Sequence, residues 1–151
     1  LKTPLTFSLD TELTYFYRGA GGSSYRLNLE PSLKYSHFFG TFKNTTKVSY
    51  LISKYQLGGS RSILKFENKA ITNKYFRLGD AFSVSLNPEL SFRFVESENQ
   101  EENPFYDNSD RVEKKKEICS GVTGYFYRKG RQLLRLSFNG QYNLYDSGNP
   151  W

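Results

Sequence analysis

The sequence has few of the residues on which common catalytic and metal sites depend. Its single cysteine, Cys119, excludes an internal disulfide framework and a cysteine-based zinc cluster. It has one histidine, His37, and no methionine. No apolar run approaches the ~20 residues that a membrane-spanning helix needs. The missing methionine and the start at Leu1 together predict a processed or fragmentary chain, from which any targeting peptide has been removed.

What the sequence has in excess is aromatic residues. They make up 17% of its 151 residues, nearly all of them Tyr and Phe. The mean hydropathy is nevertheless −0.64, which is polar. This combination is typical of a β-barrel whose strands alternate between two environments. The net charge of +6 permits contact with anionic lipid or nucleic acid but requires neither. We expect one β-barrel domain over residues 1–151.

Apolar and polar residues alternate along most of the chain, which predicts long β-strands and no helices. The seven predicted strands are Leu5–Arg18, Tyr25–Phe39, Phe42–Leu57, Ser62–Leu78, Ala81–Glu96, Val112–Arg128 and Gln132–Tyr145. Strands of globular sheets are typically ~5–6 residues long. A transmembrane strand needs ~9–11 residues, and many outer-membrane barrels continue their strands beyond the bilayer. The predicted lengths therefore favour a membrane barrel.

The connections between these strands alternate in length. Longer loops at 19–24, 58–61 and 97–110 alternate with tight turns at 40–41, 79–80 and 129–130. In this pattern, over Leu5–Tyr145, the chain resembles bacterial outer-membrane β-barrel proteins in general, whose short turns are periplasmic. The resemblance implies localisation in the bacterial outer membrane, lipid against the apolar side and a polar interior. It implies outer-membrane lipid and lipopolysaccharide as partners, and leaves other barrel or periplasmic subunits open.

The predicted number of strands is odd, whereas a closed antiparallel barrel of one bacterial chain has an even number. Three explanations remain open: an unrecognised eighth strand, a larger barrel of which this chain is part, or a wall closed by several chains. The predicted fold class is therefore an all-β, antiparallel, up-and-down transmembrane β-barrel, with about seven to eight strands visible in this chain.

Charged residues occupy the polar positions of the strands, and cations outnumber anions there. In a membrane barrel these positions line the lumen, either as ion pairs in a narrow interior or as the wall of a weakly anion-preferring pore. The lumen-lining candidates are Arg18, Arg26, Glu30, Lys34, Lys43, Lys47, Lys65, Glu67, Lys69, Glu89, Arg93 and Arg135. In a soluble, lipocalin-like barrel the same positions would face water, and the apolar side would bind a lipophilic ligand.

Aromatic residues near the strand ends suggest interfacial girdles. The candidates are Tyr15, Tyr17, Tyr25, Phe92 and Phe94 toward the outer rim, and Phe39, Phe42, Phe82 and Tyr127 toward the inner rim. The alternative is that Tyr and Phe are simply good strand formers. In the basic segment 111–118, Lys114 and Lys116 are candidates for contact with lipid-A phosphates.

Catalytic and cofactor chemistry has little support in the sequence. Ser36 and His37 are adjacent in a predicted strand, so their side chains point to opposite sides and cannot form a dyad. The acidic segment 98–110 lacks the spacing of a known calcium loop. A nucleic-acid platform is disfavoured because cations and aromatic rings point oppositely. We expect a non-enzymatic protein without cofactors or metals, acting as a pore or as a membrane scaffold within an assembly.

Overall fold

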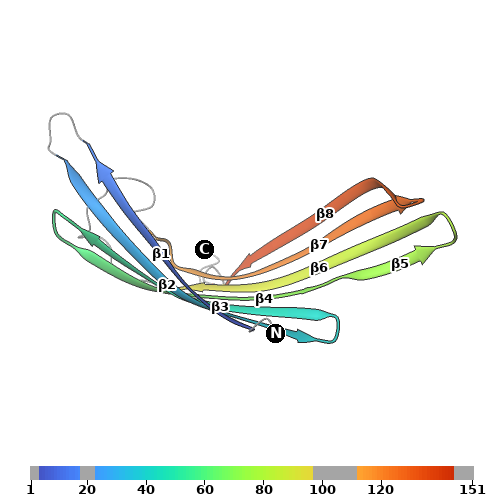
Figure 1. Cartoon of the computed structure of the whole chain (residues 1–151), viewed down its shortest axis with the longest axis horizontal. Helices are drawn as coiled ribbons and strands as arrows, with labels where there is room; N and C mark the ends of the chain where they lie inside the picture. Colours follow the sequence, from blue (N-terminus) through green and yellow to red (C-terminus); the bar gives the residue numbers. More distant parts are fainter. Residues whose placement is uncertain (1–3, 18–22, 97–111, 145–151) are drawn as a thin grey trace, which may run out of the picture. The chain divides into compact units, whose positions relative to one another are not determined.

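The computed structural model describes residues 4–17, 23–96 and 112–144, and every regular element in these ranges is a β-strand (Figure 1). The strands are β1 (Leu5–Phe16), β2 (Ser24–Phe39), β3 (Phe42–Tyr55), β4 (Ser60–Thr72), β5 (Lys74–Leu78), β6 (Phe82–Val95), β7 (Lys115–Arg128) and β8 (Arg131–Asn143). They belong to one antiparallel sheet. The predicted all-β, up-and-down fold is therefore confirmed. Within the described ranges, no helix has the length and apolar character to span a membrane.

The eighth strand arises from a break in the fourth predicted strand. The sheet order is β1-β2-β3-β4-β6-β7-β8, and β5 pairs with β6. Asn73 separates β4 from β5, and its amide nitrogen lies 2.6 Å from Asn87 Oδ1 and 3.1 Å from Ser85 Oγ on β6. The break therefore adds a strand without adding a hairpin. Over the described residues the order is open, with β1 and β8 at its two ends.

The three tight turns lie where the sequence predicts them. Gly40, Gly79 and Gly130 have φ angles of 58°, 71° and 78°, in the left-handed region that glycine adopts without a Cβ clash. Lys129 precedes Gly130 with φ 48°, so the β7–β8 turn has two successive residues at positive φ, as in a type I′ hairpin. The predicted loop 97–110, most of loop 19–24 and the final segment 146–151 lie outside the described residues.

The chain forms two compact units. The boundary between them falls within several strands, so that one strand can contribute residues to both units. Unit 1 comprises Leu1–Tyr35, Lys47–Phe66 and Phe94–Lys115, and unit 2 comprises Ser36–Thr46, Glu67–Arg93 and Lys116–Trp151. In each unit the strand alternation separates two sides. We call the side that carries the predicted lumen candidates the polar side, and the opposite side the apolar side.

Burial in this sheet is inverted relative to a soluble protein. The buried polar residues are Ser24, Arg26, Ser32, Ser49, Ser53, Arg61, Thr72, Ser85, Ser91 and Glu117. The buried apolar residues among those described are Leu51, Tyr55, Ile63 and Val84. By contrast, many Leu, Phe and Tyr side chains are exposed, with Phe7 and Leu13 at 69% and Phe138 at 71%. Charged and polar residues rarely become fully buried unless they are paired, so polar contacts must hold the polar side together.

Candidate functional site

Arg26 is the most deeply buried charged residue of unit 1. It lies on β2, on the polar side, and only 1% of its surface is exposed. Its guanidinium lies 3.9 Å from Glu12 Oε2 and 5.3 Å from the centre of the Phe16 ring on β1. Asn28 donates a hydrogen bond of 2.8 Å to the same Glu12 oxygen. A planar guanidinium can satisfy a carboxylate and a ring face together, which suits it to this buried position.

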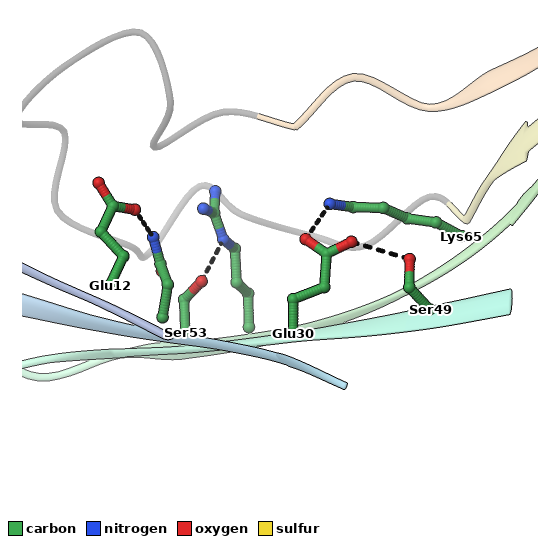
Figure 2. A network of polar contacts seen from close by, with 7 residues as sticks. Glu12, Glu30, Ser49, Ser53 and Lys65 are labelled. Carbon is green, nitrogen blue, oxygen red and sulfur yellow. Dashed lines mark hydrogen bonds and ion pairs between the residues drawn. The ribbon is translucent and has the colours of Figure 1, made fainter. Parts of the chain in front are cut away.

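Glu30 connects three strands on the polar side of unit 1 (Figure 2). Lys65 Nζ on β4 and Ser49 Oγ on β3 each donate to its carboxylate at 2.8 Å. Beside it, Arg61 Nε donates to Ser53 Oγ at 2.9 Å. Figure 2 shows the labelled Glu12, Glu30, Ser49 and Ser53 side chains extending from the same side of their strands. These contacts cross-link adjacent strands through their side chains, in addition to the backbone ladder.

A cavity of about 640 Å³ lies over this network in unit 1. Acidic and basic side chains both line it, including Asp10, Glu12, Glu30, Arg61 and Lys65. Charges of both signs therefore line the cavity, and Glu30 and Lys65 among them form an ion pair. Among the described residues, no three His, Cys, Asp or Glu side chains gather closely enough to hold a metal ion.

Unit 2 has its own polar network. Arg93 on β6 lies between Glu67 on β4, at 3.5 Å, and Glu117 on β7, at 3.4 Å. Gln141 on β8 also donates to Glu117. Separately, Lys69 forms an ion pair of 2.6 Å with Glu89. The unit 2 network therefore links β4, β6, β7 and β8 in the order in which they lie in the sheet.

The predicted lumen candidates of the described ranges lie on the polar side, at different depths. Arg26 is buried, whereas Lys34, Arg93 and Arg135 are exposed. The remaining candidates are intermediate: Glu30, Lys43, Lys47, Lys65, Glu67, Lys69 and Glu89. The contacts above bring together Glu30 with Lys65, Glu67 with Arg93, and Lys69 with Glu89. Arg18 lies outside the described residues.

The girdle candidates divide into two groups by exposure. The exposed ones are Tyr15, Tyr17, Tyr25, Phe39, Phe42 and Phe82. Phe92, Phe94 and Tyr127 are only partly exposed. Lys114 and Lys116, the lipid-A candidates, are both exposed. Their roles at a membrane surface stay predictions.

Ser36 and His37 are separated as the strand alternation predicts. Ser36 Oγ lies 3.3 Å from Thr45 Oγ1, and the His37 ring makes an edge contact with Phe39 at 4.3 Å between ring centres. Phe39 is among the exposed aromatic residues at the end of β2. The histidine therefore lies among aromatic side chains, away from the neighbouring serine.

Arg61 is a polar-side residue in a segment that the sequence predicts to be a loop. The predicted fourth strand began at Ser62, but β4 begins at Ser60, which places Arg61 in the strand and buries it to 3% exposure. The signal was present, because Arg61 has the same parity as Lys65 and Glu67. Ile63 shares this parity and is fully buried, and Leu51 and Tyr55 are also buried on the polar side of β3. The preceding glycines Gly58 and Gly59 predicted a loop and so concealed Arg61.

Comparison with known proteins shows the family of this chain. The family model described as "LptD: LPS transport system D" matches residues 1–150. A curated relative, the LPS-assembly protein LptD of Idiomarina loihiensis, is 27% identical over 178 residues. The match covers 96% of this chain and 24% of the relative, so the chain spans about a quarter of that protein's length. The chain therefore belongs to the LptD family, and this membership confirms the expected localisation in the outer membrane of a Gram-negative bacterium.

Proposed function

We propose that this chain forms part of the wall of a transmembrane β-barrel that serves lipopolysaccharide assembly at the outer membrane. Its apolar side faces lipid, and its polar side faces the aqueous interior. Its role is that of a scaffold without enzymatic activity. The segment 1–151 acts as one barrel-forming domain. The lumen-lining candidates face the barrel interior, and the girdle candidates lie at the membrane–water interfaces.

The inverted burial is the observation that supports this proposal. On the polar side, Arg26 is buried beside the Glu12 carboxylate and Arg61 is buried with a hydrogen bond to Ser53, while Phe7 and Phe138 stand exposed on the apolar side. Water would penalise such an apolar surface, at roughly 25 cal/mol per Å². Hydrocarbon would instead accommodate it, and the backbone groups are satisfied by pairing between strands, as a membrane requires.

The lipocalin-like alternative needs the apolar side to enclose a ligand. The exposure of that side argues for an external lipid medium instead. Between a pore and a scaffold, the ion pairs Glu30–Lys65, Lys69–Glu89 and Glu67–Arg93 favour the scaffold. Their charges bind each other, which leaves a weaker field for selecting ions in transit.

The link to lipopolysaccharide assembly comes from the family. The curated relative carries that activity in its name, and lipopolysaccharide is therefore the proposed cargo and lipid partner of the complete protein. The edges of β1 and β8 are the two ends of the sheet order, and an edge strand presents N–H and C=O groups with which another strand can pair. We propose that further strands of a larger barrel, or of partner subunits, continue the wall from these edges.

Site-directed spin labelling tests which side meets lipid. In a Cys119→Ser background, adjacent positions Leu33 and Lys34 of unit 1, and Ser137 and Phe138 of unit 2, are each replaced by Cys and labelled in the full-length protein in liposomes. We expect labels at Leu33 and Phe138 to be more accessible to oxygen, which partitions into lipid. Labels at Lys34 and Ser137 should be more accessible to a nickel chelate. Equal nickel accessibility within each adjacent pair would overturn the proposal.

A further inference from the structure

A groove of about 490 Å³ lies in unit 2, between the end of the β5–β6 hairpin and the end of the β7–β8 hairpin. Its apolar lining includes Leu78, Phe82, Val84, Phe126, Leu133 and Leu134. The backbone N–H of Lys129 donates to the carbonyl of Ala81 at 2.7 Å, which fastens one turn to the other. The volume lies within the ~300–1,000 Å³ of typical small-molecule sites.

The strand register explains why these apolar residues share one side. Leu78 lies opposite Phe82, and Phe126 lies opposite Leu134, so each pair projects from the same side of the sheet. After Phe126 the register shifts and Tyr127 lies opposite Gln132, which leaves Leu133 as the extra residue of a β-bulge. A bulge redirects side chains that regular alternation would place on the opposite side. It therefore allows Leu133 to line the groove beside Leu134.

Two arginines lie beyond the groove, at the end of the same hairpin. Arg128 and Arg131 are directly opposite each other in the register, and both are exposed. The Arg128 guanidinium lies 5.6 Å from the centre of the Phe82 ring, which itself lines the groove. Within the described part of the chain, neither arginine pairs with an Asp or Glu side chain. Like charges placed directly opposite destabilise a sheet, so this pair favours a bound anion.

We propose that the groove holds one acyl chain of an anionic glycerophospholipid, and that Arg128 and Arg131 bind its phosphate. The inference rests on the proposed membrane orientation. In that orientation the short turns are periplasmic and lie at the inner leaflet of the outer membrane, which is made of phospholipid. An apolar groove with two cations at its rim matches an amphiphile whose chain and anionic group are adjacent. Arginine suits the phosphate because its guanidinium donates two parallel hydrogen bonds.

Native mass spectrometry of the full-length protein tests this proposal, with phosphatidylglycerol as the probe and phosphatidylethanolamine and lipopolysaccharide as competitors. We expect the double variant Arg128→Gln/Arg131→Gln to lose phosphatidylglycerol affinity by about tenfold, since charge-assisted bonds are lost. Leu133→Trp should reduce it similarly by filling the groove. Arg128→Lys/Arg131→Lys should retain more affinity than the glutamine variant, because it keeps the charge.

The matched control is Arg77→Gln/Lys43→Gln, which removes the same charge from the polar side of unit 2. It should leave phosphatidylglycerol binding within about twofold of the parent, because neither Arg77, opposite Ser83 on β6, nor Lys43 on β3 is among the residues that line the groove. A similar loss in this control, or no loss in the Arg128/Arg131 variant, overturns the inference. Equal retention of phosphatidylethanolamine, or stronger retention of lipopolysaccharide, also overturns it.

Spin-label accessibility in the same preparations separates the two proposals. If Phe138 is exposed to lipid but the arginine variants bind phosphatidylglycerol normally, only the groove assignment fails. If Phe138 is exposed to water, the proposed membrane orientation is wrong, and the groove assignment that rests on it is wrong as well. Circular dichroism of each variant, matched to the parent, ensures that a loss of binding is not a loss of folding.

Discussion

The polar and apolar sides of the sheet differ in what holds their side chains. On the polar side, Glu30 and Arg93 each bind partners on two other strands. On the apolar side, Phe7 and Phe138 project from their strands and remain largely exposed. The difference shows that many polar side chains bind one another across strands, whereas the exposed apolar side chains depend on the surrounding medium.

The polar side itself differs between the two units. In unit 1 the Glu30 and Lys65 side chains are 23% and 29% exposed, and Arg26 nearby is fully enclosed. In unit 2 the Glu89 and Lys69 side chains are 41% and 39% exposed. Water screens an exposed ion pair and reduces its contribution to stability. The Glu30–Lys65 pair should therefore contribute more to stability than the Glu89–Lys69 pair, although both use the same kinds of residue.

The largest expected effect comes from placing a charge on the apolar side. Phe138→Arg should destabilise the protein in liposomes by about 2–4 kcal/mol if residue 138 lies near the bilayer centre. The adjacent change Ser137→Arg, on the polar side of the same strand, should cost less than about 1 kcal/mol. Urea titration followed by circular dichroism measures both. Equal costs would contradict the assignment of the two sides.

Removing Glu30 should have the next largest effect. Glu30→Ala leaves Ser49 Oγ and Lys65 Nζ without their shared acceptor, and we expect a loss of about 1.5–3 kcal/mol. The matched change in unit 2, Glu89→Ala, should cost less than about 1 kcal/mol because both members of its pair are more exposed. The same urea titration compares them. A greater loss of stability for Glu89→Ala than for Glu30→Ala would contradict the expected order of the two contacts.

The smallest effect is the difference in coupling between the two ion pairs. Double-mutant cycles on Glu30–Lys65 and Glu89–Lys69 should give about 1 kcal/mol and about 0.3 kcal/mol, respectively. Added salt should weaken the second coupling by the larger fraction, since exposed pairs are screened more. Unfolding measured at low and high salt provides both values. Couplings that are equal and equally sensitive to salt would show that burial does not distinguish the pairs.

Much of the fold could be predicted because strand alternation is a local property. The period of two assigns Glu30 and Phe138 to opposite sides without any knowledge of neighbouring strands. Glycine at the tight turns similarly marks the hairpins, because Gly40, Gly79 and Gly130 are needed where φ is positive. The family resemblance at the level of the outer membrane also followed from strand length and loop asymmetry.

The candidate site could be predicted only as a set of side chains that face the same way. Glu30 could have paired with any of several lysines, and its choice of Lys65 depends on the register across β2, β3 and β4. Arg61 was assigned to a loop because the preceding glycines suggested one, whereas strand pairing extends β4 past it. Register is set by pairing between distant segments, so no single strand contains it.

The sequence by itself determined the strands, the tight turns and the side to which each alternating residue belongs, because these depend on backbone sterics over a few residues. The tertiary structure alone decided the break at Asn73, the partners of Glu30 and Arg93, and the bulge that redirects Leu133 into the groove. Each of these depends on where one strand lies against another. Alternation is set within a single strand, whereas register and bulges are set by pairing between strands that are distant in the sequence, so only the folded sheet determines them.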